Sequence, residues 1–179
     1  MSKKVLVIST SLRSNSNSEE LADVFAEGAK EAGNQVEKIS LRDKNIGFCK
    51  GCLACLKAGK CVIRDDALEI TQKMHDAEVI VFATPIYYYE MSGQMKTMLD
   101  RANSLYGSDY CFEDIYMLSA AAEDKEGVDK RAVGGLEGWI ACFERARLAG
   151  TVFAGGVDGA GEITGHLALK SEYEMGKAV

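Results

Sequence analysis

Residues 5–18 read VLVISTSLRSNSNS, an apolar run that passes directly into a polar loop. The apolar part, Val5–Ile8, is short and rich in β-branched residues, which favours a strand over a helix. Beyond the loop, apolar or small residues recur at helical spacing, at Leu21, Val24, Phe25, Gly28, Ala29 and Ala32. The stretch therefore predicts a strand, a polar loop and a helix in succession.

The polar loop, residues 9–18, is predicted to bind an anion. A helix N-terminus carries unpaired amide N–H groups and a partial positive charge. The loop adds five serines, two asparagines and the cation of Arg13. A phosphate group suits these donors, although the loop could also serve only as a solvated turn with Asn17 or Ser18 as N-cap. No Gly-x-Gly-x-x-Gly or Gly-Lys-Ser/Thr pattern follows the first strand, which argues against a bound dinucleotide of the Rossmann kind and against a nucleoside triphosphatase.

Length and charge restrict the function further. At 179 residues the chain fits one domain, and its net charge of −6 argues against nucleic acid as a partner. No apolar run approaches the ~20 residues of a membrane span, and the N-terminus lacks the apolar region of a signal peptide. We therefore expect a cytoplasmic protein without a membrane partner. In that compartment six cysteines are expected to be thiols, metal ligands or redox groups rather than disulfides.

The remainder of the chain continues to alternate strands with helices, which predicts a doubly wound α/β sandwich of three layers. Further strands are expected at residues 35–40, 78–84, 115–120 and 151–154, with Pro85 ending the third strand. A five-stranded parallel sheet of order 2-1-3-4-5 binds ligands between strands one and three, at their carboxyl ends. Three loops should meet there: residues 9–18, 85–89 and 119–124.

The second of these loops, Pro85–Tyr89, contains three consecutive tyrosines. Its backbone amides and flat rings would lie beside the phosphate loop, an arrangement that suits a phosphorylated planar molecule such as FMN. Packing in the core or at an interface is the alternative role for these tyrosines.

Several motifs together resemble one family. Thr10–Arg13 with the following Asn/Ser run is similar to the phosphate loop of NADPH-dependent FMN reductases and related flavodoxin-fold quinone reductases. Thr84–Tyr87 and the Met95–Arg101 helix resemble the second flavin loop and its following helix in that family. The cysteine segment, at about residues 47–64, resembles the iron-sulfur flavoproteins of the same superfamily.

The resemblance implies a single flavodoxin-like FMN-binding domain over residues 1–179, reduced by NAD(P)H as a transient donor. It places the phosphate against the first loop and the flavin ring against the second, with further contacts at the ends of strands one and four. Leu12 and Thr10 depart from the family's proline and glycine, and Ser119–Ala122 replaces a glycine-rich turn. The expected cofactor-binding residues are Ser9, Ser11, Arg13, Ser16, Asn17, Ser18, Pro85, Ile86, Tyr87, Tyr88, Ser119 and Ala120.

The cysteine segment holds Cys49, Cys52, Cys55 and Cys61 within thirteen residues, at spacing C-x2-C-x2-C-x5-C. Four cysteine thiolates are the ligands of a [4Fe–4S] cluster. Free thiols, a zinc site, or a redox dithiol of Cys52 and Cys55 are the alternatives. The two remaining cysteines, at positions 111 and 142, stand alone and are expected to be ordinary buried residues.

These features favour an FMN-dependent oxidoreductase of the NAD(P)H-dependent flavin or quinone reductase type. It would pass electrons through FMN to a small-molecule or protein acceptor, and no side chain is expected to be catalytic because the chemistry belongs to the flavin. The alternative is an iron-sulfur flavoprotein that carries electrons between proteins without a small-molecule substrate of its own. By resemblance, we also expect a homodimer.

Overall fold

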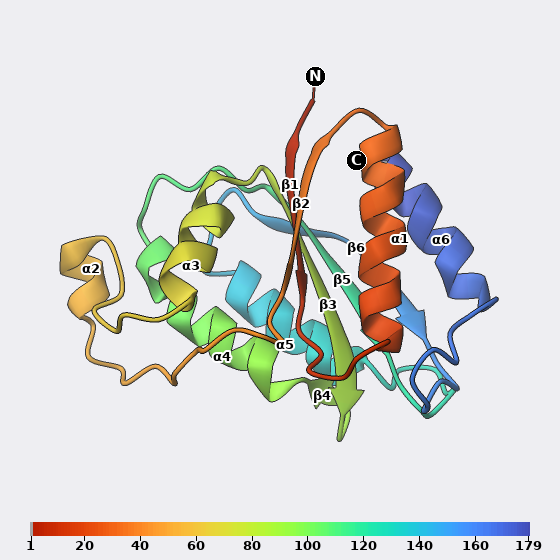
Figure 1. Cartoon of the computed structure of the whole chain (residues 1–179). Coiled ribbons are helices and arrows are strands. Elements are labelled where there is room, and N and C mark those ends of the chain that lie inside the picture. Colours follow the sequence, from red (N-terminus) through yellow and green to blue (C-terminus); the bar gives the residue numbers. More distant parts are fainter. Residues whose placement is uncertain (1) are drawn as a thin grey trace.

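A computed structural model describes residues 2–179, which form a central sheet with helices on both faces (Figure 1). In chain order the elements are β1 (Lys4–Ser9), α1 (Asn17–Glu31), β2 (Gln35–Ser40), α2 (Ala54–Ala58), α3 (Ala67–Asp76), β3 (Val79–Tyr87), β4 (Glu90–Met91), α4 (Gly93–Arg101), η1 (Ala102–Leu105), β5 (Asp114–Ala120), α5 (Lys130–Ile140), β6 (Arg147–Ala154) and α6 (Leu167–Lys177).

The sheet confirms the α/β class and the flavodoxin-like doubly wound arrangement. Five parallel strands lie in the order β2-β1-β3-β5-β6. Helices α1 and α6 cover one face, and α3, α4 and α5 cover the other (Figure 1). The expectation of five strands is incomplete, because a sixth strand, β4, pairs antiparallel with the end of β3.

The prediction that Pro85 ends the third strand is wrong. Strand β3 continues through Pro85 to Tyr87 and then turns back into β4. Pairing between β1 and β3 stops at Ser9 and Ala83, so Pro85 has a neighbouring strand only on the β5 side. The fixed φ of proline suits an extended strand, and its missing N–H is tolerated where one side of the strand is open.

Two glycines allow the backbones of α1 and α6 to contact each other directly. A Cβ at Gly28 would lie 2.3 Å from the carbonyl oxygen of Tyr173, and one at Gly176 would lie 2.3 Å from that of Phe25. Only glycine permits so close an approach of two helix backbones. The crossing fixes α6 against α1 and thereby positions the loop between β6 and α6 near the start of α1.

The core on the other face of the sheet, under α3, α4 and α5, contains a cluster of aromatic side chains. The rings of Phe112, Trp139 and Phe143 contact one another, with centroids 5.9 Å apart for Phe112 and Trp139, 5.2 Å for Phe112 and Phe143, and 4.5 Å for Trp139 and Phe143. The expectation that Cys111 and Cys142 are buried is wrong, since both are exposed. Tyr110 and Phe112 on either side of Cys111 are buried, as the two-residue period of an extended chain dictates. Cys142 follows the end of α5.

Across residues 2–179, no helix combines the length and the apolar composition that a membrane span requires.

Candidate functional site

A cleft of about 340 Å³ opens at the carboxyl ends of β1, β3 and β5. The three predicted loops meet there, as the topology requires. Its lining residues come from these loops and from one further segment; they are Ser11, Arg13, Ser16, Asn17, Ser18, Pro85, Ile86, Tyr87, Tyr88, Ala120, Ala121, Ala122, Val157 and Asp158.

The first loop presents the start of helix α1 to the cleft. Ser16 is the N-cap, not Asn17 or Ser18, and its Oγ accepts a hydrogen bond from the Glu19 N–H at 3.2 Å. The hydroxyls of Ser16 and Ser18 are also 3.0 Å apart. The first backbone N–H groups of a helix have no partner within the helix. The positive end of α1 therefore lies at the wall of the cleft.

Two predicted phosphate contacts are held by the loop that follows β6. Arg13 Nη1 donates to the carbonyl oxygen of Asp158 at 2.6 Å, which fixes the guanidinium beside the cleft. The Asn17 amide donates to the carbonyl oxygens of Val157 and Gly159 and accepts from the Ile163 N–H. Because its side chain is fully engaged, Asn17 can offer an anion only its backbone N–H.

Sequence reasoning did not assign Val157 and Asp158 to the cleft. The signal was present, because the run GGVDGAG at residues 155–161 follows the last strand at the same edge of the sheet. The segment is tied to the third loop, where Val157 N–H donates to the Ala121 carbonyl at 3.0 Å and Ala121 N–H donates to Ala154 at 2.9 Å.

A buried hydroxyl network joins the first two loops. Thr10 Oγ1 donates to the Ala83 carbonyl at 3.1 Å and lies 2.9 Å from Ser92 Oγ. Ser92 is the N-cap of α4, and its N–H donates to Thr84 Oγ1 at 3.0 Å. Thr10, which departs from the glycine of the resembled motif, therefore anchors the loop through a side chain that glycine lacks.

The second loop is a tight hairpin with two strained residues. Tyr88 and Tyr89 have φ values of 52° and 66°, in the left-handed region that L-residues rarely adopt. Tyr88 is 97% exposed, and Tyr89 donates its hydroxyl to Glu123 Oε2 at 2.9 Å. This hydrogen bond raises the pKa of Tyr89 above its usual value and joins the hairpin to the third loop. The tyrosines therefore lie outside the core of this chain.

Replacing Tyr88 by asparagine is expected to stabilise the fold by ~0.5–1 kcal/mol, because asparagine tolerates positive φ better. Denaturant titration of the free protein would measure the change. Tyr106→Asn is a matched control, since Tyr106 is also exposed but has a φ of −62°. Equal effects of the two substitutions would show that the hairpin stores no relievable strain.

Two of the predicted cofactor residues, Ser9 and Ser119, do not line the cleft. Both are buried at the ends of their strands. Ser119 Oγ donates to the Val152 carbonyl at 3.4 Å, and Ser9 Oγ has no hydrogen-bond partner within residues 2–179. The remaining predicted cofactor residues all belong to the lining.

The cysteine segment borders a separate cavity of about 410 Å³. Cys49, Cys52, Cys55 and Cys61 all line it, and so does Cys142, which sequence reasoning had treated as an isolated residue. Within the described chain, no three His, Cys, Asp or Glu side chains lie close enough together to hold a single metal ion. The segment and Cys142 therefore bring five thiols around one space, without a mononuclear site among the described residues.

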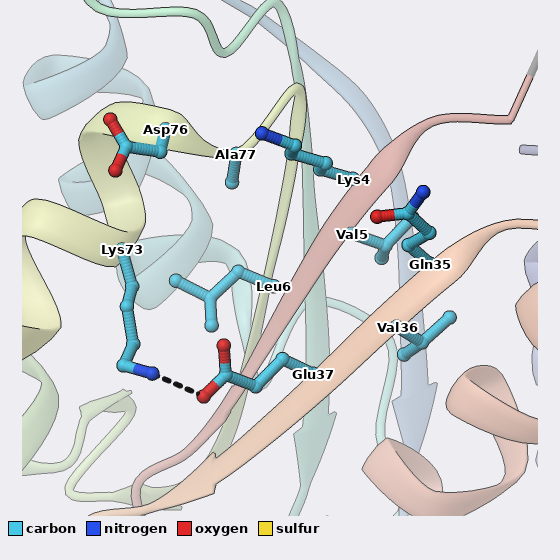
Figure 2. A pocket seen from close by; sticks show the side chains of 9 residues that line it. All are labelled: Lys4, Val5, Leu6, Gln35, Val36, Glu37, Lys73, Asp76 and Ala77. Atoms are coloured by element: carbon cyan, nitrogen blue, oxygen red, sulfur yellow. Dashed lines mark hydrogen bonds and ion pairs between the residues drawn. The ribbon is translucent and has the colours of Figure 1, made fainter.

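A third hollow, of about 420 Å³, lies at the opposite end of the sheet (Figure 2). It is bordered by the first residues of β1 and β2 and by the end of α3. Figure 2 shows Lys73 directed toward Glu37, which it contacts at 2.5 Å. This hollow lies at the amino ends of the strands and contains an ion pair. Doubly wound sheets bind their ligands at the carboxyl ends of the strands, so we do not assign a ligand to it.

Comparison with known sequences assigns the family. The sequence model that describes NADPH-dependent FMN reductases matches residues 3–130, which include all three predicted loops of the cleft. The chain belongs to the NADPH-dependent FMN reductase family.

Several relatives of this FMN reductase family member are named iron-sulfur flavoproteins. One from Archaeoglobus fulgidus is 35% identical over 98 residues, which is 55% of this chain and 44% of the relative. One from Methanosarcina thermophila is 28% identical over 138 residues, covering 76% of this chain and 72% of the relative. The chain spans about half the length of the first few curated relatives that it matches.

Solved structures share the fold of this FMN reductase family member. An NAD(P)H:quinone oxidoreductase from Methanothermobacter marburgensis has a TM-score of 0.77 at 16% identity, covering 99% of this chain and 96% of its own. An FMN-dependent NADH-azoreductase from Bacillus anthracis, in complex with FMN, has a TM-score of 0.67 at 18% identity, with 98% of each chain covered.

Proposed function

We propose that the cleft binds FMN and that the chain is an NAD(P)H-dependent oxidoreductase. The observation that carries this proposal is the pairing of an anion site with an aromatic hairpin. Arg13 and the positive end of α1 occupy one part of the lining, and Pro85–Tyr88 occupy another. Family membership agrees with this assignment.

The donor set fits the phosphate end of FMN. Ser11, Ser16 and Ser18 bring hydroxyls to the lining, and Arg13 brings a cation already oriented by Asp158. The volume of about 340 Å³ lies in the ordinary range for small-ligand sites. Pro85–Tyr88 line the same cleft, where the flat ring would lie.

When bound, FMN would supply hydride and electron transfer. The residues of this chain would bind and orient it. The Thr10–Ser92–Thr84 network holds the first and second loops together, so the distance between phosphate and ring sites is fixed before binding. The exposed ring of Tyr88 could cover a bound flavin and restrict access of water.

A second candidate function is that of an iron-sulfur electron carrier, for which the cysteine cavity is the supporting observation. Each thiolate of a [4Fe–4S] cluster binds a different iron, so the ligands surround a space instead of converging on one ion. The four predicted ligands border such a space. Arg101 is also in the lining of this space.

We also propose that the protein is a homodimer that reduces a small-molecule or protein acceptor. Exposed apolar side chains on the hairpin and the cysteine segment support an interface there, notably Tyr88, Phe48 and Leu53. The molar mass from light scattering, with and without FMN, would test the assembly.

The deciding experiment is purification without oxygen, followed by an absorption spectrum and titration with FMN. We expect one FMN per chain and oxidation of NADH or NADPH when a quinone is supplied. Stable flavin binding without steady NAD(P)H oxidation would favour the electron carrier. Protein that shows neither flavin absorption nor a heat signal on addition of FMN would refute the proposal.

A further inference from the structure

Arg101 is fully buried, yet it carries a full charge at the edge of the cysteine cavity. Its two terminal nitrogens contact both carboxylate oxygens of Asp65, at 2.5 and 2.8 Å. Burial raises the pKa of Asp65, but hydrogen bonds from Arg101 and from the Gly47 N–H outweigh it, so the pKa lies below its usual value. The pair is therefore ionised and bidentate, the strong form of such a contact.

The same guanidinium contacts both ends of the cysteine segment. Nη1 donates to the Gly47 carbonyl at 2.7 Å, and Nη2 donates to the Ile63 carbonyl at 3.3 Å. Asp65 Oδ2 also accepts from the Gly47 N–H at 2.9 Å. All four cysteines of the segment lie between Gly47 and Ile63, so one buried ion pair closes the loop that carries them.

Two residues further along the chain, Asn103 contacts a thiol directly. Its Nδ2 donates to Cys55 Sγ at 3.2 Å. Arg101, at the end of α4, and Asn103, in η1, both line the cavity. Helix η1 also packs against α2, the short helix within the segment. The segment is thus fixed from outside, at its two ends and at one of its sulfurs.

We propose that Arg101, Asp65 and Asn103 are positioning residues of the thiol cavity. The ion pair sets the path of residues 47–63, and Asn103 sets the orientation of Cys55. Where the cavity holds an iron-sulfur centre, which rests on the second candidate function above, the same residues would hold its thiolate ligands in place.

The test compares wild type with Arg101→Lys, Asn103→Ala and the control Lys96→Gln. Lysine keeps the charge but cannot span Gly47, Ile63 and both carboxylate oxygens. Lys96 lies on the same helix in an exposed pair with Asp100. Hydrogen exchange of the metal-free protein should be at least ~10-fold faster over residues 45–66 in Arg101→Lys, since breaking a buried pair is strongly destabilising. The control should match wild type.

Two further readouts make the result decisive. After reconstitution with iron and sulfide, a chelator should remove iron at least ~10-fold faster from Arg101→Lys, and faster from Asn103→Ala, while FMN stoichiometry is unchanged. Maleimide labelling of Cys55 should accelerate in Asn103→Ala, with exposed Cys111 as internal reference. Wild type that takes up no iron would refute the cluster, and exchange and labelling would still decide the positioning role. Unchanged exchange in Arg101→Lys and unchanged Cys55 labelling in Asn103→Ala would overturn it.

Discussion

Arg13→Glu is expected to weaken FMN binding at least ~100-fold and to leave the binding of riboflavin unchanged. Arg13 is exposed at the cleft, and its guanidinium is held there by the Asp158 carbonyl. A charge-assisted hydrogen bond contributes about 1.5–3 kcal/mol, and a carboxylate in its place adds repulsion of similar size against a phosphate dianion. Riboflavin lacks the phosphate, so the substitution should not affect it.

Isothermal titration of both ligands into wild type, Arg13→Glu and Lys30→Glu would measure this difference. Lys30 lies in the last turn of α1, far from the phosphate end of the helix, and serves as the matched charge reversal. Equal losses for FMN and riboflavin would indicate damage to the ring site. An FMN affinity unchanged in Arg13→Glu would place the phosphate elsewhere.

The fold could be predicted because each strand is marked by an apolar run and each crossover by helical spacing. Val5–Ile8 and the run at residues 79–84 are buried on both faces, and such strands produce an unbroken apolar sequence. Strand β4 was missed because two residues carry no periodicity. The prediction that Pro85 ends β3 was wrong because a strand tolerates proline where it has no neighbouring strand on one side. Which side of a strand has no neighbour depends on the assembled sheet and cannot be read from the sequence.

Most of the cleft could be predicted because parallel strands bring their carboxyl ends to one edge. The side-chain contacts that set the geometry of the cleft could not be predicted from the sequence. Nothing in the sequence links Thr10 to Ser92 or Asn17 to Val157, because these partners are separated by 82 and 140 positions. Cys142 and Arg101 were likewise not assigned to the cysteine cavity, since its far wall comes from helices late in the chain.

A buried carboxyl in α6 makes stability depend on pH. Glu172 is 0% exposed, and neither carboxylate oxygen has a hydrogen-bond partner within residues 2–179. Burial alone raises its pKa from the usual 4.5 to about 9. Between pH 4.5 and about pH 9, Glu172 is ionised in the unfolded chain but keeps its proton in the folded chain. Stability should therefore fall as pH rises through this window, by about 1.4 kcal/mol per unit and on the order of 6 kcal/mol in total.

Glu172→Gln removes the ionisable group while keeping a neutral polar side chain of the same size. The variant should be more stable than wild type above the usual glutamate pKa, and the difference should grow by about 1.4 kcal/mol per pH unit until about pH 9. Denaturant titrations of both proteins at several pH values would measure it, with exposed Glu174→Gln on the same helix as the control. Because every other titrating group is common to the two proteins, its contribution cancels in the difference. A difference independent of pH would mean that Glu172 ionises in the folded protein, and the carboxylate would then need a partner or solvent access at the α1–α6 crossing.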